Sequence, residues 1–276
     1  MSRTTSPQDA DPVDLWLSKM WKARVAHRLP RPRRPEPRVR AAIAQDLPPT
    51  VITQHADSVR QLWMSRIRQS VHDVYAGLPL CKLPEDLRVY EHLLWSTSPR
   101  VVIELGAYGG GSALWFRDRL RTLASYKRVT EPFVVSIEID PSQMIEALDA
   151  ADPDWRSSIQ LIAGDVRDPV TAERVAEIVP VGTPVLVAED SAHVYETTWA
   201  ALANFSRFVQ PDGYFVVEDG CVDIEELRLD DGWPRGVLPA VRDWLAIEEG
   251  QAFRVRRDLE LYGLTSSPEG LLQRIR

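Results

Sequence analysis

The feature that most constrains the fold of this chain is an alternation of short apolar runs with longer helical stretches, which begins at residue 100. The apolar runs predict strands at residues 100–105, 133–138, 159–163, 184–189 and 213–218. The stretches between them predict helices at residues 111–124, 142–150, 170–179 and 195–208. Because strands that alternate with helices require right-handed crossovers, we expect a parallel sheet with helices on both faces.

The C-terminal part of the pattern differs from the rest. A helix is expected at residues 237–248, followed by strand-like runs at 252–257 and 259–265. Only Asp258 separates these two runs, which excludes a parallel crossover and predicts an antiparallel hairpin. The predicted fold class is therefore α/β, with a Rossmann-like parallel sheet that ends in an antiparallel C-terminal hairpin.

The first part of the chain is expected to be a helical N-terminal extension, residues 1–75, before an α/β domain at residues 76–276. Helical spacing predicts helices at residues 12–27, 53–77 and 84–97. Between the first two lies a Pro/Arg-rich stretch at 28–40, whose prolines exclude a regular helix. We interpret this stretch as a solvated linker in preference to a basic arm for anionic surfaces.

Composition excludes several classes of partner. A formal net charge of −7 argues against nucleic acid as a partner, because a phosphate backbone favours a basic face. No apolar run is long enough for a transmembrane helix, and the polar N-terminus does not look like a secretory signal. Cys81 and Cys221 lie in no disulfide or metal spacing, which fits a reducing compartment. We therefore expect a cytoplasmic protein with no membrane partner.

Glycines and acids follow the first three predicted strands. The first strand leads into a Gly-rich turn, where a missing Cβ lets the backbone approach a ligand. A structural tight turn is the competing interpretation, and Gly-x-Gly-x-x-Gly is absent, which disfavours a dinucleotide site. Glu138, with Asp140 as the alternate, ends the second strand where a carboxylate can accept ribose hydroxyls. Asp165 ends the third strand, where a carboxylate could accept a hydrogen bond from an adenine amino group. The predicted nucleoside-binding residues are Gly106, Tyr108, Gly109, Ser112, Glu138, Asp140 and Asp165.

A second set of acids follows the fourth and fifth predicted strands. Asp190 comes after the fourth strand, and Glu218 and Asp219 come after the fifth. If the strands are neighbours, these carboxylates converge and repel one another, and a hard divalent cation such as Mg²⁺ or Mn²⁺ relieves the repulsion. The alternative to a metal site is that these acids cap the next helix or face solvent. His193, three residues after Asp190, is the candidate general base for a substrate hydroxyl, with Asp190 beside it.

These motifs resemble the cephalosporin hydroxylase-like family, which includes sugar O-methyltransferases and has the class I methyltransferase fold. The resemblance runs from about Gly77 to the C-terminus. The strings that carry it are Val102-Ile-Glu-Leu-Gly-Ala-Tyr-Gly-Gly-Gly-Ser-Ala113, Asp190-Ser-Ala-His193, Gly213-Tyr-Phe-Val-Val-Glu-Asp219, Gly236-Val-Leu-Pro-Ala-Val-Arg-Asp-Trp-Leu245 and Tyr262-Gly-Leu-Thr-Ser-Ser-Pro-Glu-Gly-Leu-Leu-Gln-Arg274. The resemblance implies S-adenosylmethionine (SAM) as cofactor, with an adenosyl site at Glu104, Gly106, Glu138 and Asp165. It also implies a magnesium site at the second acid set, His193 as base, and a homo-oligomer.

The resulting prediction is a metal-dependent SAM O-methyltransferase that acts on a hydroxyl of a small natural product, such as a sugar in antibiotic biosynthesis. A cephalosporin-type hydroxylation or methoxylation protein is an alternative, but the sequence shows no two-His-one-carboxylate triad. A non-catalytic scaffold with the same fold is another. We also interpret the acidic stretch from Cys221 to Arg235, which contains Trp233, as a substrate-facing lid.

Overall fold

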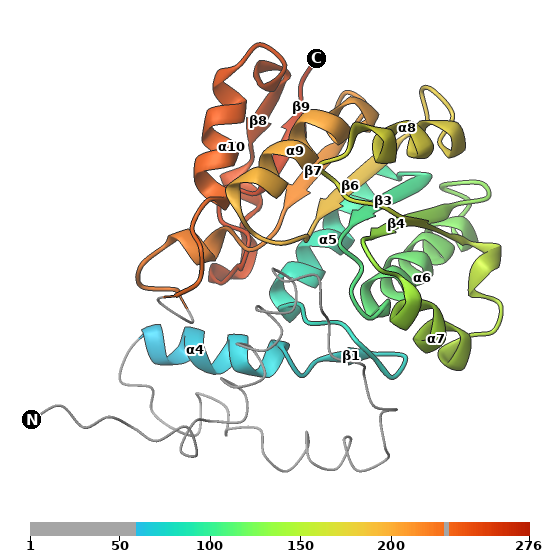
Figure 1. Cartoon of the computed structure of the whole chain (residues 1–276), viewed down its shortest axis with the longest axis horizontal. Helices are drawn as coiled ribbons and strands as arrows, with labels where there is room; N and C mark the ends of the chain where they lie inside the picture. The colour runs from blue at the N-terminus through green and yellow to red at the C-terminus, as the bar shows by residue number, and fades with distance from the viewer. Residues whose placement is uncertain (1–58, 229–231) are drawn as a thin grey trace, which may run out of the picture. The chain divides into compact units, whose positions relative to one another are not determined.

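A computed structural model describes residues 59–228 and 232–276, and its centre is a seven-stranded sheet (Figure 1). The strands lie in the order β5-β4-β3-β6-β7-β9-β8. Neighbours from β5 through β7 are parallel, whereas β9 is antiparallel to both β7 and β8. The strand bounds are β3 Val101–Leu105, β4 Phe133–Glu138, β5 Ile159–Ala163, β6 Val185–Glu189, β7 Tyr214–Val217, β8 Phe253–Val255 and β9 Leu271–Arg274.

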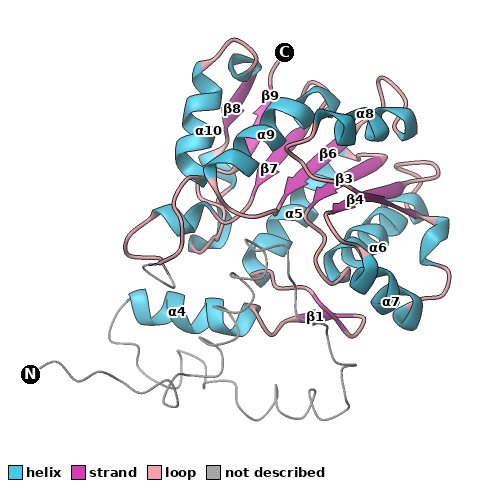
Figure 2. Cartoon of the chain, viewed as in Figure 1, coloured by secondary structure: helices cyan, strands magenta, loops and turns pink. Residues whose placement is uncertain are grey.

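Helices cover both faces of this sheet, as Figure 2 shows. Their bounds are α4 Val59–Ser70, α5 Pro84–Thr97, α6 Gly111–Ser125, α7 Ser142–Ala151, α8 Pro169–Ile178, α9 Tyr195–Phe205 and α10 Val237–Ala246. Local sequence explains where some of them begin. Pro84 and Pro169 occupy the first turn, where a missing N–H is harmless, and the Asp168 side chain accepts from the Val170 N–H. The doubly wound arrangement predicted from the sequence is confirmed.

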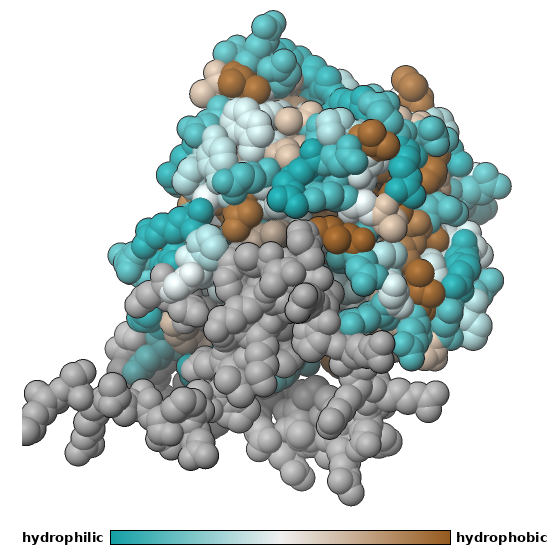
Figure 3. All heavy atoms as spheres, in the orientation of Figure 1, coloured by the Kyte–Doolittle hydropathy of each residue, from teal (hydrophilic) through white to brown (hydrophobic). Residues whose placement is uncertain are grey.

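The core forms two layers because each central strand is buried on both faces. In β3, Val101, Ile103 and Leu105 pack into one layer, and Val102 packs into the other. All four are fully buried. This is the expected environment of a strand in a parallel sheet with helices on both sides. On the outer face shown in Figure 3, hydrophobic residues are scattered among mainly hydrophilic ones.

The C-terminal hairpin differs from the prediction. The run at 259–265 is not a strand, and a hairpin around Asp258 alone is wrong. Tyr262 and Gly263 have φ angles of 70° and 74°, which break an extended run. The partner of β8 is β9, and β9 lies between β8 and β7. The antiparallel end of the sheet was therefore predicted correctly, but with the wrong second strand.

The N-terminal predictions are only partly within the described residues. Of the helix expected at 53–77, residues 59–70 form α4, residues 53–58 lie outside the described residues, and the last part is wrong because residues 74–75 form a strand. The helix at 84–97 is α5. A short hairpin of β1 (Val74–Tyr75) and β2 (Leu78–Pro79) joins them. The expected helix at 12–27 and the linker at 28–40 lie outside the described residues, so the boundary at residue 75 stays a prediction. In the part of the chain that is described, no helix has the length and apolar character needed to cross a membrane.

Candidate functional site

The register of the sheet brings the predicted site residues to one edge. Leu105 lies opposite Glu189, and Glu189 lies opposite Val217, so the residues that follow these strands emerge side by side. The ladder continues one step further, because Asp190 N–H donates to Leu105 O at 2.8 Å and Glu218 N–H donates to Glu189 O at 2.9 Å. The strand order reverses at β3, and in open α/β sheets ligands bind at this point of the carboxyl edge.

The Gly-rich turn after β3 is fixed by close backbone contacts. Gly106 has a φ of +90°, and a Cβ there would lie 2.2 Å from the carbonyl oxygen of Asp190. A Cβ on Gly111 would lie 2.2 Å from the carbonyl oxygen of Pro79, in β2. Glycine is therefore required at both positions for packing. Gly109, beside Pro79, and Tyr108, with a φ of 43°, complete the turn.

Glu138 ends β4 beside this turn. Its Oε2 accepts from the Tyr108 N–H and its Oε1 accepts from the Ile139 N–H, both at 2.9 Å. These two bonds hold a half-buried carboxylate next to the turn. Asp140, the alternate candidate, is exposed and accepts from Ser142 N–H and Oγ at the start of α7, which lowers its pKa. Of the two acids, Glu138 is the one bonded to the turn.

Glu104, the acid inside β3, lies beneath the turn. It is 1% exposed, and its Oε2 accepts from the Ser136 hydroxyl at 2.6 Å. Burial raises the pKa of Glu104, and hydrogen bonds from Ser112 and Ser136 oppose that shift. Ser112 is also buried. The Glu104 carboxylate therefore ties β3 to Ser112, the second residue of the helix that follows the turn.

Asp165, after β5, is half-buried and already has a cationic partner. Arg167 Nε donates to both of its carboxylate oxygens at 3.0 Å, and the Arg167 backbone N–H donates to Oδ1 at 2.9 Å. The predicted contact of this acid with an adenine amino group stays a prediction.

Asp190, His193 and Asp219 form the compact cluster of the site. One donor atom from each lies within 4.8 Å of the others. His193 Nε2 is 3.5 Å from Asp190 Oδ1 and 3.2 Å from Asp219 Oδ2, and the imidazole is 1% exposed. His193 and Asp219 both have left-handed backbone conformations, with φ angles of 54° and 57°. Such conformations are uncommon outside glycine and occur often at functional sites.

Glu218 does not join this cluster, although the sequence placed it with Asp190 and Asp219. Both of its oxygens accept from Lys82 Nζ, at 2.6 and 2.7 Å, and Oε1 also accepts from the Tyr90 hydroxyl at 2.7 Å. Lys82 Nζ also donates to Asp190 Oδ2 at 3.0 Å. Burial raises the pKa of Glu218, although Lys82 opposes the shift. Burial disfavours the Lys82 ammonium, but the two carboxylates outweigh it and raise the pKa of Lys82.

Sequence reasoning missed Lys82 altogether. It lies between β2 and α5, among the buried residues Leu80 and Leu83, and is itself 4% exposed. A lysine among apolar residues just before a helix was the only signal in the sequence. A buried lysine requires an anionic partner, but no pattern indicated that the partners lie 108 and 136 positions away.

Glu189, the last residue of β6, is a second buried acid that the sequence did not single out. It is fully buried, and its Oε1 accepts from the Ser191 N–H at 3.1 Å and from the Ser191 hydroxyl. No hydrogen-bond partner for Oε2 exists among the described residues. Burial raises the pKa of Glu189 to about 7, against the opposing hydrogen bonds from Ser191.

Described residues of the segment predicted as a lid lie beside the cluster. The Trp233 ring is 6.2 Å from the His193 ring, with an angle of 41° between the planes. The Arg228 guanidinium donates to the carbonyl oxygens of Val222 and Trp233. From α4, Trp63 Nε1 donates to the Leu227 carbonyl at 2.6 Å. The position fits a lid, and contact of Trp233 with substrate stays a prediction.

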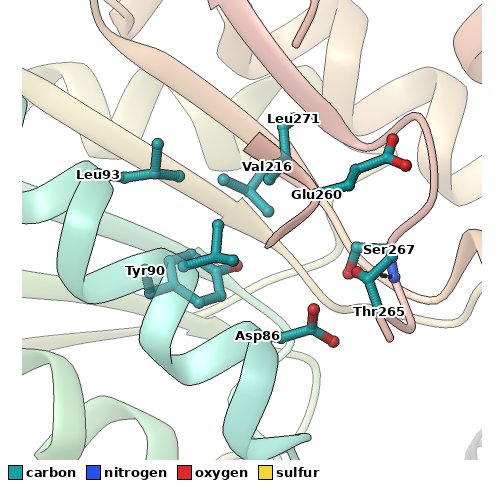
Figure 4. Close-up of a pocket in the computed structure, with 9 residues that line it drawn as sticks. Asp86, Tyr90, Leu93, Val216, Glu260, Thr265, Ser267 and Leu271 are labelled. Carbon is teal, nitrogen blue, oxygen red and sulfur yellow. Dashed lines mark hydrogen bonds between the residues drawn. The ribbon is translucent and has the colours of Figure 1, made fainter. Parts of the chain in front are cut away.

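A small cavity lies on the other side of Tyr90, as Figure 4 shows. Its volume is about 10 Å³, and Asp86, Glu260 and Thr265 are among its lining residues. This volume matches about one water molecule. The Tyr90 ring lines the cavity while its hydroxyl bonds Glu218, so the cavity borders the acid cluster but is too small for a substrate.

Comparison with known proteins gives consistent results. A family model described as "Rhamnosyl O-methyltransferase/CmcI" matches residues 68–275. The chain is also similar to the Rhamnosyl O-methyltransferases of Mycobacterium bovis (strain BCG / Pasteur 1173P2) and Mycobacterium tuberculosis (strain ATCC 25618 / H37Rv). Each is 24% identical over 204 residues, which cover 72% of this chain and 77% of the relative.

Two solved structures of CmcI are similar in fold. A structure titled as CmcI with Mg and SAM has a TM-score of 0.54 and 23% identity, covering 75% of this chain and 78% of that one. An apo structure of CmcI has a TM-score of 0.54 and 22% identity, covering 84% and 86% of the two chains. These likenesses confirm the predicted class I methyltransferase fold.

Proposed function

Because the chain belongs to the Rhamnosyl O-methyltransferase/CmcI family and is a SAM-dependent O-methyltransferase, we propose that it methylates a sugar hydroxyl of a small natural product with the help of a divalent cation. The observation that carries this proposal is the cluster of Asp190, His193 and Asp219, with donor atoms within 4.8 Å of one another. The cluster lies at the edge of the sheet that also holds Glu138 and the Gly-rich turn.

The residues after β3 and β4 fit the adenosyl part of SAM. A carboxylate offers about four acceptor positions, and the backbone bonds from Tyr108 and Ile139 use two of those of Glu138. The remaining positions can accept vicinal ribose hydroxyls. The hydrogen bond of Glu104 with Ser112 joins β3 to the helix after the turn, and Gly106 lets the turn approach the backbone of Asp190, after β6. SAM, when bound, supplies a methyl group on a positively charged sulfur.

The acid cluster fits a hard divalent cation. Asp190 and Asp219 offer carboxylate oxygens close together at the ends of neighbouring strands, and oxygen ligands suit Mg²⁺ or Mn²⁺. We propose these two acids as the ligands, and Glu218, the third predicted ligand, would join them only in competition with Lys82. A cation held there would stabilise negative charge that develops on a substrate hydroxyl oxygen.

We assign His193 the role of proton acceptor. Its Nε2 lies 3.2 Å from Asp219 Oδ2, so the carboxylate can orient the ring and stabilise the imidazolium once it has formed. With Nε2–H donating to Asp219, Nδ1 is the ring nitrogen that can accept a proton. The residue is 1% exposed, so little bulk water reaches the ring. In the proposed transfer, the hydroxyl proton passes to the imidazole, the hydroxyl oxygen bonds the methyl carbon, and the bond from that carbon to sulfur breaks to give S-adenosylhomocysteine (SAH).

The proposed acceptor class comes from the relatives, which are named Rhamnosyl O-methyltransferases. A role in antibiotic biosynthesis, a cytoplasmic location and a homo-oligomeric state stay predictions. A hydroxylation or methoxylation role, the alternative weighed from the sequence, has no specific observation in its favour.

The experiment measures methyl transfer from isotopically labelled SAM to a panel of rhamnosides and other deoxysugar glycosides, together with calorimetric titration of SAH. We expect SAH to bind, labelled methyl to appear on a sugar hydroxyl, and EDTA to suppress transfer in a way that Mg²⁺ reverses. His193→Gln should lower kcat about 10²- to 10⁴-fold, because it removes the base, and leave SAH affinity unchanged.

His92→Gln is the matched control, because His92 is an exposed histidine on α5. Failure of SAH to bind under any condition would contradict cofactor use. Full transfer in EDTA would refute the metal, and a kcat of His193→Gln equal to that of His92→Gln would refute the base.

A further inference from the structure

Lys82 is a buried cation inside the acid cluster that the proposed reaction does not use. Its side chain is 3% exposed. An ammonium group has three donors, and Nζ lies within hydrogen-bond distance of three carboxylate oxygens. These are Glu218 Oε1 at 2.6 Å, Glu218 Oε2 at 2.7 Å and Asp190 Oδ2 at 3.0 Å. Its whole donor capacity is therefore directed at two of the three acids that the sequence assigned to a metal.

The contacts of Lys82 divide the acids into two groups. Glu218, 4% exposed, is held by Lys82 and by the Tyr90 hydroxyl at 2.7 Å. Asp219 is on the other side, with its Oδ2 3.2 Å from His193 Nε2. Asp190 belongs to both groups, because its Oδ2 accepts from Lys82 while its Oδ1 lies 3.5 Å from His193 Nε2.

A divalent cation and Lys82 therefore compete for the same oxygens. Mg²⁺ binds carboxylate oxygens at about 2.0–2.1 Å and prefers near-octahedral geometry. Lys82 and Tyr90 already use three of the about four acceptor positions of Glu218, so a cation that binds Glu218 competes with Nζ for its oxygens. A second cation beside a buried ammonium is also repelled, and this repulsion is strong where water is excluded.

We propose that Lys82 is a positioning residue that holds Glu218 out of the metal site and thereby weakens the binding of the divalent cation. The inference rests on the metal site of the proposed function. In the wild-type protein, Lys82 neutralises Glu218 and shares Asp190, so the metal relies on Asp190 and Asp219 and exchanges readily. Without Lys82, Glu218 loses its cationic partner, and its oxygens become available to the metal.

The test is calorimetric titration of MgCl₂ into SAH-bound protein. Lys82→Met removes the ammonium and keeps the volume of its stem. We expect Mg²⁺ to bind this variant about tenfold or more tightly than wild type, a size typical of changes in residues that contact metal ligands. In EDTA its Tm should fall by about 6 °C or more, because a buried pair loses one partner, and Mg²⁺ should restore it.

Two further variants isolate the cause. Lys82→Gln keeps hydrogen-bond donors toward Glu218 without the charge, and it should also bind Mg²⁺ more tightly than wild type. It carries the test if Lys82→Met folds poorly. The double variant Lys82→Met/Glu218→Gln should lose the gain in affinity, because the recruited ligand is gone. Lys127→Met is the matched control, since Lys127 is exposed, and it should bind Mg²⁺ as wild type does.

Mg²⁺ affinity that is unchanged or weaker in both Lys82 variants would overturn the inference, as would a double variant that keeps the gain. SAH titrations of the same samples separate this failure from failure of the proposed function. If SAH binds and Mg²⁺ affinity does not respond to Lys82, the methyltransferase stands and the competition is refuted. If Mg²⁺ binds neither wild type nor variant, the metal site and the competition both fail.

Discussion

Replacement of Glu189 by glutamine tests whether this buried acid lowers stability at neutral and alkaline pH. Burial raises the pKa of Glu189 from 4.5 to about 7. Between these values the folded state holds a proton that the unfolded state has lost, so stability falls as pH rises through this window. A shift of about 2.5 pKa units corresponds to about 3 kcal/mol at pH 8, and the penalty at pH 5 is about 1 kcal/mol.

Glu189→Gln removes the charge and keeps an acceptor for Ser191. The glutamine amide adds a buried donor whose cost does not depend on pH, so that cost cancels when two pH values are compared. We therefore expect the difference in unfolding free energy between variant and wild type to be about 2 kcal/mol more favourable to the variant at pH 8 than at pH 5.

Urea denaturation in EDTA at both pH values measures this difference. Glu177→Gln is the matched control, because Glu177 is exposed on α8, and its effect should be the same at both pH values. A Glu189→Gln effect that does not change between pH 5 and pH 8 would refute the reasoning, because it would mean that Glu189 ionises alike in the folded and unfolded chains.

Two further substitutions test how the site is supported. Gly106→Ala should lower the unfolding free energy by about 3 kcal/mol or more, because a Cβ meets a carbonyl at 2.2 Å, and should abolish SAH binding. Gly182→Ala, with a similar φ of +81° but open space, should cost only about 1 kcal/mol, and equal losses in thermal melts would contradict the clash. Trp63→Phe should lower Tm by about 2–4 °C, since it removes the hydrogen bond to the segment after β7. Trp95→Phe, at a half-exposed position, is its control, and an equal Tm for the two would argue against that anchor.

The parallel part of the fold could be predicted because its strands are buried on both faces. A run such as Val101–Leu105 is apolar almost throughout, and its length and flanking glycines distinguish it from a helix. The C-terminal pair was harder. Strand β9 is four residues long and ends in Gln273 and Arg274, so it lacks the apolar run that marks the other strands. The run at 259–265 has that character, but Tyr262 and Gly263 turn the backbone.

The site could be predicted as far as strand ends determine it. Asp190 and Asp219 come together because parallel strands end at one edge, and this follows from the sequence once the strands are placed. The partners of each acid do not follow. Asp165 is bonded to its near neighbour Arg167, whereas Glu218 is bonded to a lysine 136 positions earlier. Such a pairing depends on how the segment before α5 packs, which no periodic pattern records.

The separation in sequence between Lys82 and Glu218 affects how the protein loses activity. Their ion pair exists only when the segment before α5 and the end of β7 are both in place. A partly folded chain that lacks either part leaves an isolated charge in an apolar setting, which is unfavourable. Intermediates that keep the sheet but release this segment are thus high in free energy and sparsely populated. Loss of cofactor binding and loss of tertiary structure should then occur at the same denaturant concentration, so activity reports on the integrity of the whole domain.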